Sequence, residues 1–335
     1  MKDEQVILKY ALQNAVRYDG KAQPGAVMGK VFSELKVKDK KELAKKVQQI
    51  IRDVNKLKLD EQKAKLEKLA PELLEKKKKE EKKELPELKN AVKGKVVTRL
   101  PPEPSKYNHI GHAMSFLINY LYAKKYEGKC ILRFEDTNPL KATQAFVDAM
   151  TTDVLDYLDI KPDKVVFASD DLPMLYKYAE RLIENGKAYV CSCKQDKMRE
   201  LRHCGKCCPC RENSVKENFD KWKKMLDREY KEGEVVLRLK GDIESCNHCM
   251  RDPVIFRIVF AEHYRQKNKY CVWPMYDFEN AIEDSVNGVT YILRSNEFGT
   301  MRIELQNHIK ELLGLSKQVI IHYGRFNITG ATTQG

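Results

Sequence analysis

The chain begins with a helical pattern of hydrophobic positions that continues to about residue 73. One buried helix face is predicted by the three- and four-residue spacing of Leu8, Ala11, Leu12 and Ala15, and another by Val47, Ile50, Ile51 and Val54. Residues 19–29 (DGKAQPGAVMG) interrupt this pattern, and we predict a loop between helices from Gly20 to Gly29. Residues 75–84 (EKKKKEEKKE) can bury nothing, so we expect a solvated linker or, equally, a basic segment that faces a partner.

From residue 96 the pattern changes to short apolar runs that alternate with helical stretches, which is typical of a doubly wound parallel sheet. The predicted strands are Val96–Arg99, Lys129–Phe134, Val165–Ala168 and Tyr189–Cys191, and the predicted helices lie near 109–126, 142–158 and 171–186. A cysteine-rich segment follows, and after it come strands at Glu234–Leu239 and Val254–Val259 and an apolar block at Tyr270–Leu293. We therefore predict one nucleotide-binding α/β fold with an insertion between about residues 190 and 270.

Composition indicates the net charge of the protein and the compartment in which we expect it. Of the 335 residues, 33% are charged and the formal net charge is +13, which indicates a polyanionic partner or merely an excess of solubilising lysine. The chain has no apolar run long enough for a membrane span, and its polar start does not resemble a signal peptide. We expect a cytosolic protein whose ten cysteines are reduced, and their clustering indicates a metal site.

Two histidines bracket a glycine where the first predicted strand leads into a helix, in His109-Ile110-Gly111-His112. A helix N-terminus has unpaired N–H groups and partial positive charge, and imidazoles can donate hydrogen bonds to phosphate oxygens. Gly111 would let a flat ring or a phosphate approach the backbone. The tetrapeptide therefore predicts a phosphate site, with a helix start that carries two solvated histidines as the alternative.

Several motifs together resemble those of class I aminoacyl-tRNA synthetases, most closely the glutamyl and glutaminyl group in its archaeal and eukaryotic form. In chain order they are YALQNA (10–15), GAVMG (25–29), RLPPEPS (99–105), HIGH (109–112), RFEDTNP (133–139), WPMYDF (273–278), Asp284, GVT (288–290) and LR (293–294). The resemblance runs from the N-terminus to about residue 330. It implies that an amino acid carboxylate attacks the α-phosphorus of ATP, and that the aminoacyl group then moves from the adenylate to the terminal adenosine of tRNA.

The resemblance also implies a domain plan. We expect a class I Rossmann-type α/β catalytic domain in two parts (93–190 and 270–335) and an inserted zinc-bearing acceptor-stem domain (191–269). An N-terminal α-helical domain with its charged linker (1–92) precedes them, and the segment at 75–84 is then a candidate for contact with tRNA.

The resemblance implies that His109 and His112 bind the phosphates of ATP, which enters with Mg²⁺, and that Gly111, Glu297 and Phe298 complete the ATP site. Such catalysis works by positioning and charge stabilisation, without a covalent intermediate on the protein.

Glutamate is the expected amino acid because Arg294 corresponds to the residue that holds the substrate's side-chain carboxylate in the glutamyl enzymes. A guanidinium binds a carboxylate through charge-assisted hydrogen bonds, and facing glutamine it would remain a desolvated, unpaired cation. Arg99 is expected to contact a substrate carboxylate and Glu135 the ammonium, and Tyr276 and Asn280 match pocket residues. Ordinary salt bridges for the arginines and a helix-capping role for Glu135 are the alternatives.

By the family pattern, Cys191, Cys193, Cys208 and Cys210 are the expected ligands of a structural zinc ion, and Cys204 and Cys207 compete as the second half. Reduced thiols without a ligand are the alternative. Cys246 and Cys249 form a further pair to which the resemblance gives no role, and Cys130 and Cys271 are expected core residues.

Residues 324–335 (GRFNITGATTQG) contain no KMSKS-type loop, whose lysine stabilises the pyrophosphate end of the transition state in class I synthetases. We expect the N-terminal and catalytic portion of a split or truncated enzyme that charges glutamate tRNA with a second polypeptide, which carries that loop and the anticodon-binding domains. The alternatives are a relative that glutamylates a modified tRNA base and a non-catalytic tRNA-binding or scaffold protein.

Overall fold

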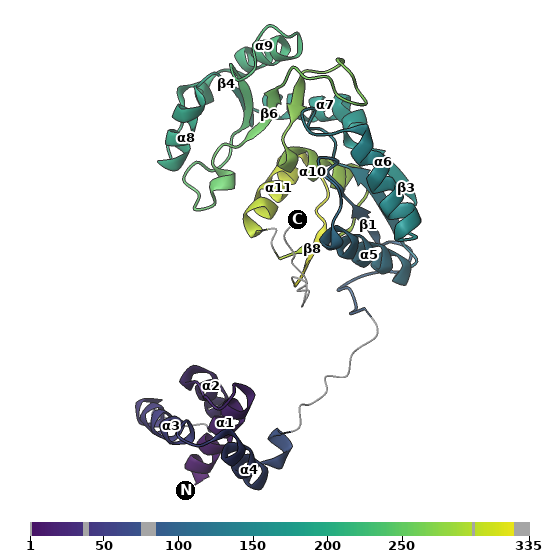
Figure 1. Ribbon diagram of the computed structural model, residues 1–335. Helices are drawn as coiled ribbons and strands as arrows, with labels where there is room; N and C mark the ends of the chain where they lie inside the picture. The colour runs from purple at the N-terminus through teal and green to yellow at the C-terminus, as the bar shows by residue number, and fades with distance from the viewer. Residues whose placement is uncertain (1, 36–39, 75–84, 297–298, 325–335) are drawn as a thin grey trace. The chain divides into compact units, whose positions relative to one another are not determined.

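The computed structural model describes residues 2–35, 40–74, 85–296 and 299–324. The chain divides into two compact units, Met1–Leu85 and Pro86–Gly335, which are described separately (Figure 1). The predictions for residues 75–84, for Glu297 and Phe298, and for residues 325–335 lie outside the described part. No described helix is both long and apolar enough to cross a membrane.

The first unit is helical (Figure 1). It contains α1 (Lys2–Arg17), α2 (Pro24–Glu34), α3 (Lys40–Val54), α4 (Leu59–Leu69) and a short 3₁₀ turn at Pro71–Leu73. Its core holds most of the positions that the helical pattern singled out, namely Ala11, Leu12, Ala15, Val47, Ile51 and Val54. The hydrophobic face of each helix is therefore buried against its neighbours, as the periodicity predicts.

The loop predicted from Gly20 to Gly29 is wrong for its second half, because α2 begins at Pro24. Proline is favoured in the first turn of a helix, where its missing N–H would be unpaired in any case. Val27 and Val31 are fully buried in the core of this unit. Their burial outweighs the helix-propensity cost of Gly25 and Gly29, which is about 1 kcal/mol for each glycine.

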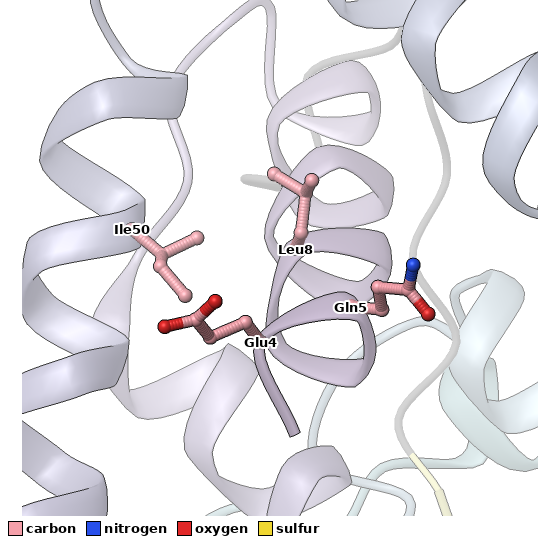
Figure 2. A pocket seen from close by; sticks show the side chains of 4 residues that line it. All are labelled: Glu4, Gln5, Leu8 and Ile50. Atoms are coloured by element: carbon pink, nitrogen blue, oxygen red, sulfur yellow. The ribbon is translucent and has the colours of Figure 1, made fainter. Parts of the chain in front are cut away.

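A shallow hollow of about 360 Å³ lies between α1 and α3, lined by Glu4, Gln5, Leu8 and Ile50 (Figure 2). Glu4 and Gln5 are exposed and Leu8 and Ile50 only half-buried, so the hollow is open to solvent.

The second unit contains the predicted parallel strands. β1 (Val97–Leu100), β2 (Lys129–Phe134) and β3 (Lys164–Phe167) pair in parallel in that order, and β8 (Tyr291–Ser295) pairs in parallel with β9 (Val319–Tyr323). The Thr290 N–H donates to the Val97 carbonyl at 2.9 Å, so the start of β8 lies beside β1. The helices of this part are α5 (Ile110–Lys125), α6 (Gln144–Thr152) with a π-helical turn at Asp153–Tyr157, α7 (Leu172–Glu184), α10 (Tyr276–Val286) and α11 (Thr300–Leu313), with a 3₁₀ turn at Ala168–Asp171.

A four-stranded antiparallel sheet is formed by the middle part of this unit's sequence. It consists of β4 (Ala188–Cys191), β5 (Val236–Leu239), β6 (Val254–Ile258) and β7 (Val272–Pro274), accompanied by α8 (Gln195–His203), α9 (Val215–Leu226) and 3₁₀ turns at Pro209–Glu212 and His248–Met250. The strand predicted at Tyr189–Cys191 as part of the parallel alternation therefore pairs antiparallel with β5. A short apolar run predicts a buried strand, but it does not reveal its partner or direction.

Residues 86–92 pack on the second unit, although the predicted boundary assigned them to the N-terminal domain. The Leu88 N–H donates to the Tyr126 hydroxyl at 2.7 Å, and that hydroxyl donates to Glu87. The Tyr291 hydroxyl donates to the Lys89 carbonyl at 2.8 Å. These bonds tie the entry segment to α5 and β8.

Candidate active site

The residues predicted to bind glutamate gather at the carboxyl ends of neighbouring strands. Arg99 is the third residue of the four-residue β1, Glu135 directly follows β2, and Arg294 is next to last in β8. Tyr276 and Asn280 lie in α10. In open α/β sheets this edge is the usual place for ligands, because the chain returns from each strand through loops that can surround them.

His109 is the N-cap of α5, and its Nδ1 accepts the Gly111 N–H at 3.1 Å. The Nδ1 of His112 accepts the His109 N–H at 3.1 Å, and the two ring centroids are 4.0 Å apart. Burial, His109 and Lys106 lower the pKa of His112 to about 4, so this imidazole is neutral at pH 7. Because Nδ1 accepts a hydrogen bond in both rings, the ring proton lies on Nε2, which leaves Nε2–H available to a ligand.

Gly111 has a structural role that the sequence did not predict. A Cβ at this position would lie 2.9 Å from Cε1 and 3.0 Å from Nδ1 of His109. The glycine therefore makes room for the His109 ring itself, which folds over the first turn of α5.

Asp284 on α10 is fully buried and joins arginines from two strands. Its Oδ1 accepts from Nη1 of Arg133 at 2.8 Å and from Nε of Arg99 at 3.2 Å. Burial acts to raise the pKa of Asp284, but the charges of Arg133, Arg99 and Lys310 outweigh it and lower the pKa to about 2. The ionised carboxylate thus fixes the orientation of both guanidinium groups.

Glu135 continues this network on the other side of Arg133. Its Oε1 accepts from Nη2 of Arg133 at 2.9 Å and from Nδ2 of Asn280 at 2.6 Å. The Asn280 Oδ1 is buried and accepts no hydrogen bond among the described residues. Glu135 is therefore held as an acceptor by two neighbours, and it does not cap a helix.

Arg294 and Tyr276 belong to the same buried region. Burial lowers the pKa of Arg294, and the nearby positive charge of Arg99 lowers it further. Burial also raises the pKa of Tyr276, with the charge of Glu135 acting in the same direction. These couplings, with the hydrogen bond from Asn280 to Glu135, bring all five predicted glutamate-binding residues into one group. We use the name charged cluster for these five residues and five further side chains, namely Arg133, Glu279, Glu283 and Asp284, with Lys310 of α11.

Two carboxyl groups of the charged cluster have raised pKa values. Glu279 is almost fully buried, accepts from the Thr137 hydroxyl at 2.5 Å through Oε2, and has no partner for Oε1 among the described residues. Burial and the charge of Glu135 raise its pKa well above the ordinary value, which favours the neutral carboxyl. Burial likewise raises the pKa of Glu283 to about 7 and lowers that of Lys310 to about 8.

The charged cluster therefore has an excess of positive charge at neutral pH. Its four basic side chains face at most three ionised carboxylates once Glu279 is neutral, and partial protonation of Glu283 increases the excess. A buried site of this kind favours a ligand with net negative charge. The basic members are Arg99, Arg133, Arg294 and Lys310, and the acidic members that ionise are Glu135, Glu283 and Asp284.

The family motifs include Arg133 and Asp284 without giving them a role, and no motif includes Glu279, Glu283 or Lys310. A signal existed for Arg133, because a charged residue inside the apolar strand Lys129–Phe134 needs a buried partner. For the two glutamates and Lys310 the helical pattern gave no comparable signal, since charges on a helix are ordinarily solvated.

The thiols of Cys191, Cys193, Cys208 and Cys210 form a compact group in which all four sulfur atoms lie within 4.8 Å of one another. The Sγ atoms of Cys191 and Cys208 are 3.7 Å apart, and those of Cys193 and Cys210 are 3.8 Å apart. A tetrahedral ion with metal–sulfur bonds of about 2.3 Å requires sulfur atoms roughly 3.8 Å apart, so this donor set fits zinc. The competing Cys204 and Cys207 are exposed and lie outside the group.

Nη1 of Arg238 donates to Sγ of Cys208 at 3.5 Å and to Sγ of Cys191 at 3.8 Å. A guanidinium in this position stabilises thiolates, which are the form that binds a metal.

Comparisons with known proteins agree with this geometry. A family model of the class I tRNA synthetases (E and Q), catalytic domain, matches residues 95–333. Glutamate–tRNA ligase of Pyrococcus furiosus is 47% identical over 337 residues, which cover 98% of this chain and 59% of that protein. The ligase of Methanocaldococcus jannaschii is 42% identical over 327 residues, 97% of this chain and 58% of that protein. The chain thus spans somewhat less than 60% of the length of these relatives.

A solved structure of a glutamate tRNA ligase from Elizabethkingia meningosepticum resembles this one with a TM-score of 0.51. It is 21% identical in sequence, and the match covers 69% of this chain and 49% of that chain, so it supports the fold alone. The family match includes both parallel sheets, the antiparallel sheet between them and every member of the charged cluster. The chain therefore belongs to the class I tRNA synthetases of the glutamyl and glutaminyl group.

Proposed function

We propose that this chain is the catalytic portion of a glutamate–tRNA ligase, which activates glutamate with ATP and transfers it to the 3′ end of glutamate tRNA. The observation that carries the proposal is the buried excess of positive charge around Arg99 and Arg294. Free glutamate has a net charge of about −1 at pH 7, whereas glutamine is neutral overall, so the cluster favours glutamate.

In the first step an oxygen of the glutamate α-carboxylate bonds to the α-phosphorus of ATP, and the bond from that phosphorus to pyrophosphate breaks. Arg294 binds the side-chain carboxylate, Arg99 binds a substrate carboxylate, and Glu135 accepts a hydrogen bond from the ammonium. The Nε2–H groups of His109 and His112 donate to phosphate oxygens beside the N-terminus of α5. Mg²⁺ accompanies ATP as part of the substrate.

We also propose that Cys191, Cys193, Cys208 and Cys210 hold a structural zinc ion. The thiol spacing supports this assignment, as does the donation from Arg238. The ion would link the end of β4 to the turn at Pro209–Glu212 and so stiffen this side of an inserted domain that binds the acceptor stem of tRNA.

The relatives extend beyond the region that this chain matches. We therefore propose that complete charging also uses the part of such an enzyme that lies outside the matched region.

Calorimetric titration with two non-hydrolysable adenylate analogues tests the proposal for the amino acid. We expect the chain to bind the glutamyl analogue at least tenfold more tightly than the glutaminyl analogue. Arg294→Gln should remove this preference, whereas the control Arg199→Gln, in an exposed ion pair with Asp196, should retain it. Equal binding of both analogues by the unmodified chain would refute glutamate as the substrate, and no binding of either would favour a scaffold.

A further inference from the structure

Two cysteine pairs outside the Cys191 group lie on chain segments that face each other. Cys204 and Cys207 follow the end of α8, and Cys246 and Cys249 flank the start of the 3₁₀ turn at His248–Met250. Each pair has the Cys-x-x-Cys spacing that places two thiols on one side of a tight turn.

Two arginines clamp these segments together by reciprocal hydrogen bonds to the main chain. Arg202 donates to the carbonyls of Arg251 at 2.8 Å and of His248 at 2.9 Å. Arg251 donates in return to the carbonyls of Arg202 at 2.9 Å and of His203 at 3.0 Å. The backbones that carry the two cysteine pairs are thus held at a fixed separation.

Further contacts bring the turns themselves close. The rings of His203 and His248 stack with their centroids 6.3 Å apart. Gly205, between Cys204 and Cys207, has φ of +63°, and a Cβ there would lie 3.4 Å from the Ile243 carbonyl oxygen. The turn that carries Cys204 and Cys207 therefore lies directly against the segment that leads to Cys246.

The surroundings of these thiols suit an anionic centre. Cys204, Cys207 and Cys246 are exposed and Cys249 is half-buried. Arg202 and Arg251 are held against both segments by their hydrogen bonds to the main chain, so two guanidinium groups lie beside the cysteine pairs. A divalent ion with four thiolates has a net charge of −2, which the adjacent arginines would offset.

We propose that Cys204, Cys207, Cys246 and Cys249 form a second site for a thiophilic divalent cation such as Zn²⁺. In the described residues these sulfur atoms are not gathered within 4.8 Å, as those of the Cys191 group are. Closing the site requires rotation of the exposed Cys204, Cys207 and Cys246 side chains about the Cα–Cβ bond, towards the half-buried Cys249.

Such an ion would connect α8 with α11. Asn247, between the second pair of cysteines, donates through Nδ2 to the Met301 carbonyl at 2.8 Å and to Glu304 Oε2 at 2.8 Å. Met301 and Glu304 lie in the first turns of α11, the helix that also carries Lys310 of the charged cluster. The second ion would therefore hold the start of α11 in place from outside the active site.

Metal analysis of the full chain, purified without oxygen and supplied with zinc, tests the proposal. We expect two zinc ions per chain, and one after the double substitution Cys246→Ser and Cys249→Ser. Cys208→Ser with Cys210→Ser should also leave one, and the control Cys130→Ser, at a buried thiol outside both sets, should leave two. One ion in the unmodified chain, or no loss in the Cys246 and Cys249 variant, would overturn the second site.

Cobalt substitution and thiol counting provide independent readouts. Cobalt in the Cys208 and Cys210 variant should give the intense visible absorption of a tetrahedral thiolate site, because only the second site then remains. Titration of the unfolded chain with a thiol reagent, in the presence of a chelator, should find ten free thiols. Absence of that absorption would overturn the second site, and fewer than ten thiols in the anaerobic protein would indicate a disulfide in its place.

Discussion

Asp284 is the side chain whose charge most directly organises the charged cluster, and Asp284→Asn removes that charge with almost no change in shape. The asparagine Oδ1 can still accept from Arg133 and Arg99, as the carboxylate does at 2.8 and 3.2 Å. What the variant loses is the negative charge that compensates two guanidinium groups, each at most 3% exposed.

Leaving a buried charge without its partner costs about 3–5 kcal/mol. The second unit has roughly the size for which 1 kcal/mol shifts the melting temperature by about 2–4 °C. We therefore expect Asp284→Asn to lower the melting temperature of this unit on the order of 10 °C. Tryptophan fluorescence reports on this unit alone, because Trp222 and Trp273, the two tryptophans of the chain, are both buried in its core.

Asp196→Asn is the matched control, since the Asp196–Arg199 pair at 3.4 Å is exposed on α8. An exposed pair of this kind contributes less than about 1 kcal/mol, so the control should melt within a few degrees of the unmodified chain. The pKa of Asp284 is lowered from 3.8 to about 2 in the folded state. Its stabilisation is therefore present above pH 4 and is lost as the pH falls towards 2. A loss for Asp284→Asn no larger than that of Asp196→Asn at pH 7 would refute this account.

Three further substitutions test separate parts of the site. Glu279→Gln should change the free energy of unfolding at pH 7 by less than about 1 kcal/mol, because Glu279 is already neutral; a loss in urea denaturation as large as that of Asp284→Asn would contradict its neutrality. Since burial raises the pKa of Glu283 to about 7, stability should fall by up to about 3 kcal/mol as the pH rises from about 4.5 to 7, and Glu283→Gln should flatten that slope in urea titrations at several pH values. Gly111→Ala would place a Cβ 2.9 Å from the His109 ring and should weaken binding of an ATP analogue about tenfold by calorimetry, an effect that unchanged affinity would exclude.

The local pattern of hydrophobic positions was sufficient to predict the elements whose burial follows from their own residues. β2 begins and ends as predicted, at Lys129–Phe134, because an apolar run in a central parallel strand has few alternative boundaries. The pattern was insufficient for α2, where two glycines and a proline indicate a loop unless the burial of Val27 and Val31 is known. It was also insufficient for β4, since strand direction depends on a partner 45 or more residues away.

In the candidate site, too, some features could be predicted from the sequence and others could not. Family motifs were enough to select Arg99, Glu135 and Arg294, and the structure gathers these residues at one edge of the parallel strands. No motif could reveal that Glu279 is neutral, because its pKa depends on burial by α10 and its neighbours and on the charge of Glu135. The prediction that Gly111 makes room for a ligand missed the His109 ring for a similar reason, since the ring reaches Gly111 only through its own hydrogen bond.

These buried pKa values also connect stability with substrate preference. The positive excess on which the proposed preference for glutamate rests is greatest when Glu283 is protonated and Lys310 is charged, and their pKa values are about 7 and about 8. As the pH rises through this interval, Glu283 ionises and Lys310 loses its proton, and both changes reduce the excess. The discrimination between a substrate with net charge −1 and a neutral one must weaken with it. Selectivity for glutamate in the proposed reaction is therefore a property of the whole charged cluster, in which Arg294 supplies the contact and the neutral Glu279 preserves the field that makes the contact selective.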